Sequence, residues 1–114
     1  MSEIVTELIS KALDGLELRY RFQAQNIANA NAPDYRATYV DFEQSLRAAA
    51  EHGAGAIEAV QPHLVQASAE DGPVRLDREL ATASQTAERY RALLDILGQQ
   101  MALSRAVITN EGRS

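Results

Sequence analysis

The second half of the sequence carries apolar or small residues every three or four positions over about thirty residues. Alternating steps of three and four give a 3.5-residue period, which is typical of the seam of a left-handed coiled coil. The stripe consists of Leu80, Ala83, Ala87, Tyr90, Leu94, Leu97, Met101, Ser104 and Ile108. The pattern therefore predicts a long helix over residues 77–109. Because Leu93 and Ile96 widen the apolar surface beyond what one helix covers, further neighbours are expected.

A second periodic segment covers residues 1–31. Its stripe consists of Val5, Ile9, Leu13, Leu16, Tyr20, Gln23 and Ile27. Glu7 with Lys11 and Glu17 with Arg21 are spaced for ion pairs on the outer surface of a helix. Such a helix is roughly 40 Å long at about 1.5 Å per residue, although Gly15 weakens its middle by about 1 kcal/mol.

The region between the two helices, residues 32–76, is rich in turn-forming residues. Residues 37–42 alternate loosely, as an extended segment does. Asp41 is then expected to be the N-cap of a short helix over 42–51, in which Glu43 would pair with Arg47. Residues 52–73 contain three of the six glycines and are expected to be loop, or disordered until a partner binds, with a short strand over 62–66 as the alternative.

These segments predict a mainly α fold in a single domain of 114 residues. Two long terminal helices form a coiled-coil-like hairpin, or join the helices of neighbouring copies, and a turn-rich, partly extended or disordered middle connects them. A lone two-helix hairpin is marginally stable in water. The sequence therefore suggests a protein that works inside an assembly.

The composition excludes several classes of partner and site. The net charge is −5, so nucleic acid, which requires a basic face, is not an expected partner. The chain has no cysteine, which excludes disulfides and thiol catalysis. No apolar run has the length of a membrane span, and the first residues lack the pattern of a cleavable secretory signal. We therefore expect either a cytoplasmic protein or one exported without cleavage.

The residues that normally carry catalysis are sparse. The two histidines, His52 and His63, lie in the turn-rich middle without an acidic partner nearby in the sequence. Asp41 and Glu43 fit a helix cap and a surface ion pair better than a catalytic carboxylate pair. The short Gly53-Ala54-Gly55 segment does not resemble a phosphate-binding loop. We therefore expect no enzymatic activity, no cofactor, no metal and no small-molecule substrate.

The first helix ends in a run of small and amide-bearing residues, Asn26-Ile27-Ala28-Asn29-Ala30-Asn31, followed by Pro33. Asparagine is unfavourable inside helices because its amide competes for backbone hydrogen bonds, and proline ends the helix. One interpretation is a helix end whose amides cap the backbone. The other is a subunit interface, since small residues allow close approach of a second backbone. The candidate interface residues are Asn26, Ile27, Asn29, Asn31, Tyr35, Tyr90, Leu94, Leu97 and Met101.

Three segments carry a resemblance to a known family. Residues 26–37 resemble the N-terminal signature of bacterial flagellar rod and hook proteins, which typically reads A-N-N-I-A-N-x-x-T-P-G-Y-K/R. Residues 40–46 and the blocks 74–80 and 88–92 look like the corresponding segments of the proximal rod type, the FlgB type. Asp34 and Ala32 replace the usual Gly and Thr, and residues 48–72 show no clear match.

The resemblance implies a structural subunit of the flagellar basal-body rod. Members are exported by the flagellar type III apparatus without cleavage and polymerise in the periplasm through their terminal helices, so that the rod transmits torque. The implied partners are other copies of the chain, other rod and axial proteins, the export apparatus and basal-body components. Two alternatives stay open: another axial protein of the FlgC proximal type, and a cytoplasmic helical adaptor or coiled-coil oligomer whose asparagine run matches by accident.

Overall fold

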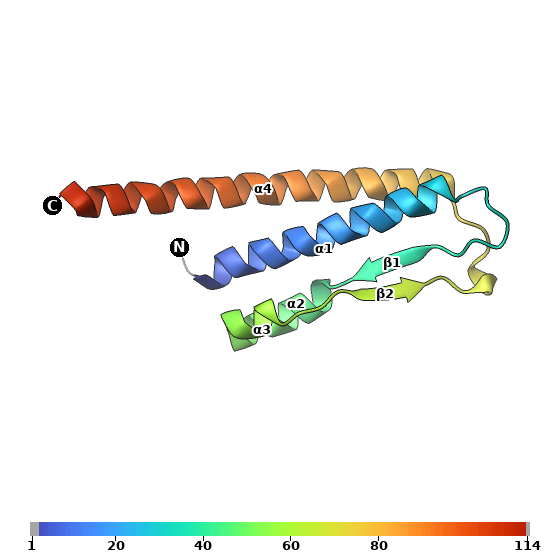
Figure 1. The fold of residues 1–114 in the computed structure, drawn as a ribbon, viewed down its shortest axis with the longest axis horizontal. Helices are drawn as coiled ribbons and strands as arrows, with labels where there is room; N and C mark the ends of the chain where they lie inside the picture. Colours follow the sequence, from blue (N-terminus) through green and yellow to red (C-terminus); the bar gives the residue numbers. More distant parts are fainter. Residues whose placement is uncertain (1–2, 114) are drawn as a thin grey trace.

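The computed structural model describes residues 3–113, and the two long terminal helices form its main body (Figure 1). Helix α1 spans Glu3–Ala28 and helix α4 spans Leu76–Arg113, and they lie side by side with opposite directions. This confirms the predicted mainly α fold with a terminal helix hairpin. The helices end close to the predicted limits, but α4 continues to Arg113, four residues beyond the expected end. The intervening elements are β1 (Thr38–Asp41), α2 (Glu43–Ala49), η1 (Ala50–His52), α3 (Ala54–Glu58), β2 (His63–Gln66) and η2 (Ala69–Asp71).

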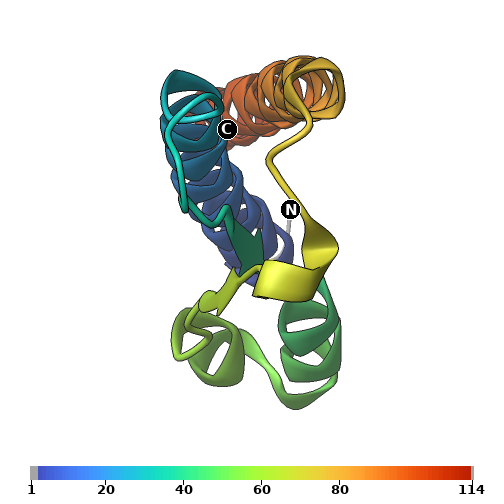
Figure 2. The same cartoon turned by 90° about the vertical axis from the view of Figure 1, so that its right-hand side faces the viewer.

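The molecule is long and thin, with principal extents of 67 × 26 × 13 Å and a radius of gyration of 18.1 Å. A compact chain of this length would have a radius of gyration of about 13 Å. Helix α1 packs against α4 on one side and against β1, α2 and α3 on another (Figure 2). The first helix is therefore the element that joins the two parts of the fold.

The two short strands pair antiparallel, although α2, η1 and α3 lie between them in the sequence, and we call this strand pair the hairpin. In it, Val40 faces Leu64 and Tyr39 faces Val65. The Ala67 amide extends the pairing by donating a hydrogen bond of 2.8 Å to the Ala37 carbonyl. Alternation is visible only in β1, where Val40 is buried, whereas every residue of β2 is exposed. The structure thus confirms the expected extended segment near 37–42, and over 62–66 it shows the strand that was the alternative to a loop.

A small apolar core lies where this hairpin and the short helices meet α1. The buried side chains of the cluster are Leu16, Val40, Phe42, Leu46 and Ile57. The prediction that residues 52–73 are loop or disorder is wrong, because α3, β2 and η2 are formed and Ile57 has no exposed surface. Tertiary packing stabilises such short helices, and a Gly- and Ala-rich stretch does not display that packing in its local pattern.

The helix cap expected at Asp41 is also absent. Asp41 is the last residue of β1, and Phe42 occupies the N-cap position of α2 without a side-chain cap hydrogen bond. Glu43, expected to pair with Arg47 one turn along the helix, pairs instead with Arg19 of α1. The prediction gave Glu43 a partner on its own helix, although Glu43 links two elements, because sequence spacing identifies only neighbours on the same helix.

The other predicted surface pairs had different outcomes. Glu17 and Arg21 form the expected pair on α1, at 3.0 Å. Lys11, which was expected to pair with Glu7, reaches across to the short helices, where its ammonium donates to the Val60 carbonyl at 3.3 Å. Contacts between elements again replaced a contact within the helix.

Candidate assembly interface

The asparagine at the end of α1 holds the following chain in place. Asn26 has no exposed surface. Its Oδ1 accepts hydrogen bonds from the Tyr35 hydroxyl (2.9 Å) and the Thr38 amide (3.1 Å), and its Nδ2 donates to the Thr38 carbonyl (3.0 Å). Within the single chain, the Asn26 side chain is therefore occupied by internal hydrogen bonds, and its place in a subunit contact stays a prediction. A buried amide needs both donors and acceptors, and the backbone of Thr38 supplies one of each.

The remaining residues of the asparagine run lie nearer the surface. Ile27 and Asn29 are half-buried. The side-chain Nδ2 of Asn29 donates to the Gln25 carbonyl at 2.9 Å, as the capping interpretation predicts. Asn31 is exposed in the turn that follows. Asp34 adopts a left-handed conformation with φ of 65°, the region that favours glycine, so the turn keeps a glycine-like geometry without the glycine.

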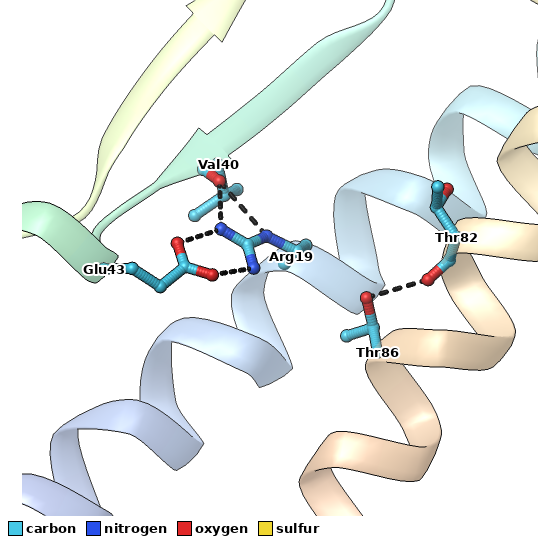
Figure 3. Close-up of polar contacts among 5 residues, drawn as sticks. All are labelled: Arg19, Val40, Glu43, Thr82 and Thr86. Carbon is cyan, nitrogen blue, oxygen red and sulfur yellow. Dashed lines mark hydrogen bonds and ion pairs between the residues drawn. The ribbon is translucent and has the colours of Figure 1, made fainter.

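Arg19 is the main polar link between α1 and the hairpin, and sequence reasoning did not single it out (Figure 3). Its guanidinium donates two hydrogen bonds of 2.6 Å to the two carboxylate oxygens of Glu43. Two further bonds, from Nη2 (2.7 Å) and Nε (3.2 Å), go to the Val40 carbonyl. These hydrogen bonds hold the pKa of Glu43 below its ordinary value, against the opposing effect of partial burial.

Phe42 explains the glycine in the middle of α1. The Arg19 guanidinium lies 4.8 Å from the centroid of the Phe42 ring, a cation–π distance. Gly15 lies one turn earlier on the helix, and a Cβ built there would come within 2.6 Å of that ring. The ring therefore packs directly on the helix backbone, and a glycine is required for this close approach.

The inward face of α4, which packs against α1, is polar at one end and apolar at the other. Glu79 and Thr86 are buried on it, and Leu93 and Leu97 are half-buried further along. The Thr86 hydroxyl donates to the Thr82 carbonyl of its own helix at 3.0 Å (Figure 3). These positions are seven, seven and four residues apart, so they lie on one face of the helix and form a seam one residue away from part of the predicted stripe.

The predicted stripe of α4 is accordingly divided between two faces. Ala83, Tyr90 and Leu97 lie half-buried at the edge of the contact with α1. Most other members of the stripe are exposed: Leu80 (51%), Leu94 (48%), Met101 (55%), Ile108 (67%) and Ser104, whereas Ala87 is half-buried. The predicted stripe therefore does not form one continuous seam against α1. We call the five residues Leu80, Ala87, Leu94, Met101 and Ile108 the outward stripe.

Apolar grooves run on both sides of the helix pair. One, with a volume of about 340 Å³, has Tyr20, Tyr90 and Leu94 in its lining, and Glu17 and Arg91 are also part of it. The other, about 560 Å³, lies between the helix pair and α2 and is lined by Leu8, Ala12, Leu16, Phe42, Glu43, Leu46, Arg47, Ala50, Arg89, Ala92 and Leu93. Both have the elongated apolar character that suits a helix from a neighbouring molecule.

The last turns of α4 extend beyond the start of α1 at Glu3 (Figure 1). All residues from 101 to 112 are exposed, including the large apolar side chains of Met101, Leu103, Val107 and Ile108. We call residues 101–112 the overhang. It extends past the start of α1, and an isolated helix of this length is marginal in water.

A polar cleft of about 620 Å³ lies between α1, β1 and the first turns of α4. The oxygens Gln23 Oε1 and Glu79 Oε2 are buried beside it and have no hydrogen-bond donor among residues 3–113. Tyr39 borders the cleft, and burial followed by the negative charge of Glu79 raises its pKa. These groups face several arginines of the cleft wall, so the cleft is mixed in charge.

The described residues contain no grouping typical of a metal centre. Within residues 3–113, no three His, Cys, Asp or Glu side chains are grouped to hold a metal ion. His52 and His63 are exposed and belong to η1 and β2. No helix in this part of the chain is both long and apolar enough to span a membrane.

Comparison with known proteins does not assign the chain to a family. No protein-family model matches it, and no curated protein matches it either.

Proposed function

We propose that this chain is a structural subunit of the bacterial flagellar basal-body rod, of the proximal (FlgB-like) type. The observation that carries the proposal is the outward stripe and overhang of α4, uncovered apolar surface on a narrow helix hairpin. It occurs together with the flagellar-type signature at residues 26–37. Monomeric proteins rarely expose contiguous apolar surface of this kind unless it is a binding site.

In this proposal the function is mechanical. Burial of the outward stripe and the two grooves between subunits supplies the association energy, and α1 with its attached hairpin supplies the stiff body. The contacts join different surfaces of successive subunits, so they propagate along a helix and do not close a ring. The resulting periplasmic tube transmits torque, and the subunits reach it through the flagellar export apparatus. The chain needs no cofactor, metal or substrate for this role.

The buried hydrogen bonds of Asn26 to Tyr35 and Thr38, which we call the Asn26 latch, give the signature a structural role within the proposal. Its hydrogen bonds to Thr38 and Tyr35 fix where the chain leaves α1 and enters the hairpin. The exposed members of the signature, such as Asn31, stay available for neighbouring subunits. One part of the signature thus shapes the subunit, and another part contacts its neighbours.

Deletion of the gene, followed by complementation, tests the proposal. We expect loss of swimming and, in electron micrographs of purified basal bodies, rings without a rod or hook. The intact chain should restore both, and Leu94→Asp should not, because an unpaired carboxylate would be buried at the contact. Gln99→Asp, on the same helix but off the outward stripe, is the matched control and should complement.

Normal swimming and complete basal bodies in the deletion strain would contradict the proposal. If the deletion strain loses its rod, but a rod protein that occupies the neighbouring position along the axis restores it, the result would instead indicate the FlgC type. A chain that stays in the cytoplasm as a closed helical oligomer would indicate the adaptor alternative.

A further inference from the structure

The outward stripe has a strict seven-residue repeat. Its five members lie at positions 80, 87, 94, 101 and 108, a span of about 42 Å at 1.5 Å per residue. A seven-residue repeat stays on one side of a helix when that helix winds around a partner. The inward seam already has α1 as its partner. The outward stripe is more apolar and more exposed, although Ala87 and Leu94 also line the groove that Tyr20 of α1 borders.

The stripe is complementary to itself when two copies run in opposite directions. Its centre is Leu94, so an antiparallel overlay on that residue places Leu80 opposite Ile108 and Ala87 opposite Met101. The exposed positions between these residues also alternate in size: Ser84, Arg91, Gly98 and Arg105. In the same overlay, Gly98 lies opposite Tyr90 and Ala83 lies opposite Arg105, whereas Ser84 lies opposite Ser104. Gly98 and Ala83 thus each lie opposite a large residue, as close packing of a helix pair requires.

Charge favours the same orientation. A parallel, in-register pair would place Arg91 against Arg91 and Arg105 against Arg105. The antiparallel pair separates these arginines and brings Arg91 close to Asp95 of the second copy, on the flank of the contact. Like charges that face each other destabilise a helix pair, and opposite charges at its flank select its orientation.

The overhang supplies the remaining surface. In the antiparallel overlay, residues 101–112 of one copy lie along the beginning of α4 in the other. There Leu76 and Leu80 are exposed, at 42% and 51%. These two exposed apolar surfaces would therefore cover each other twice in one symmetric contact.

We propose that the free chain forms a two-fold symmetric dimer in which the outward stripes of two α4 helices pack antiparallel, with Leu94 at the symmetry axis. Such a contact is closed and involves the same surface on both copies, so it does not itself build a filament. It goes beyond the proposed rod function. Because the outward stripe cannot be covered twice, the dimer and any assembly through that stripe exclude each other.

The absence of cysteine from the chain makes disulfide trapping a clean test. Under mild oxidation, Leu94→Cys should cross-link to a second copy, because the symmetry axis brings the two positions together. Leu80→Cys and Ile108→Cys should cross-link to each other in a mixture, and each alone should do so poorly. Self-cross-linking of Leu80→Cys would show a parallel pair and overturn the proposal.

Sedimentation equilibrium of the intact chain gives the second readout. We expect a dimer, and about a hundredfold or greater rise in its dissociation constant in Leu94→Asp, with circular dichroism showing that the helices persist. Gln99→Asp should stay dimeric. A monomer at all concentrations, or no effect of Leu94→Asp, would overturn the dimer. The complementation result would be unaffected, so the two proposals fail separately.

Discussion

At the scale of single residues, Gly15 shows how packing can reverse a helix propensity. In an isolated helix, Gly15→Ala would add stability of about 1 kcal/mol. Here the new Cβ would lie within 2.6 Å of the buried Phe42 ring, and overpacking of a core costs about 1–3 kcal/mol. We expect a net loss of about 1 kcal/mol in the free energy of unfolding, measured by urea denaturation.

Gly55→Ala is the matched control for this substitution. Gly55 is helical and has open space around a built Cβ, so alanine there should leave stability unchanged or raise it by up to about 1 kcal/mol. If both variants were stabilised, Phe42 would not pack on Gly15 as described.

Asn26 is the second residue whose role depends on its surroundings. Asn26→Ala would leave the Thr38 amide and carbonyl and the Tyr35 hydroxyl without their partner. Unsatisfied buried polar groups cost about 1–3 kcal/mol each, so we expect a loss of at least about 2 kcal/mol in unfolding free energy. Asn31→Ala, in the exposed turn, should change it by less than about 0.5 kcal/mol. Equal effects at the two positions would contradict the latch.

At the scale of elements, the Arg19–Glu43 pair connects α1 to the hairpin and should make that connection sensitive to acid. The folded-state pKa of Glu43 is lowered, chiefly by its hydrogen bonds from Arg19. A carboxyl of this kind contributes stability above its unfolded pKa of about 4.3, and the contribution is lost as pH falls through the lower folded pKa. The pair should therefore stabilise the protein at neutral pH and fail below about pH 4.

Glu43→Gln isolates this contribution. We expect the variant to be less stable than the parent by about 1 kcal/mol at pH 7, with the difference shrinking toward zero by pH 3 in urea titrations. Glu17→Gln removes the exposed pair with Arg21 and should show a difference of about 0.5 kcal/mol or less at any pH. A Glu43→Gln difference that stays constant with pH would mean that packing, and not charge, connects the two elements.

At the scale of the whole molecule, substitutions at Leu94 and Leu97 distinguish an effect on assembly from an effect on folding. Leu97 is half-buried against α1, so Leu97→Asp should lower the free energy of unfolding by about 2 kcal/mol or more. Leu94 is 48% exposed, so Leu94→Asp should leave folding stability nearly unchanged and abolish swimming. Thermal unfolding and motility, measured on both variants, check this division; a strongly destabilised Leu94→Asp would place Leu94 in the inward seam.

The elements with long periodic patterns were predictable from the sequence, and the short ones were not. The stripes of α1 and α4 repeat over many turns, so each identified its helix almost to the correct ends. Helix α3 rests on the burial of Ile57, a single apolar residue among glycine and alanine. A single apolar residue forms no periodic pattern, and the residues that Ile57 packs against lie far away in the sequence.

The candidate interface was predictable to a similar degree. The apolar character of Leu94 and Met101 was evident, but the direction in which each faces was not, because α1 could pack on either side of a stripe this wide. Arg19 carried no signal that distinguished it from a surface arginine. Its importance comes from Val40, Phe42 and Glu43, which approach it only after the chain turns back beyond Ala28.

The sequence by itself determined the two long helices, the turn after Ala28 and the excess of apolar surface on α4, since each depends on residues within a few positions of one another. Only the tertiary structure decided that Asn26 is buried, that the middle segment is ordered and that α1 takes one half of the α4 stripe. Those outcomes depend on contacts between residues far apart in the chain. Burial of Asn26 became favourable only once Tyr35 and Thr38 supplied its hydrogen-bond partners, and burial of Ile57 only once α1 offered it a packing surface.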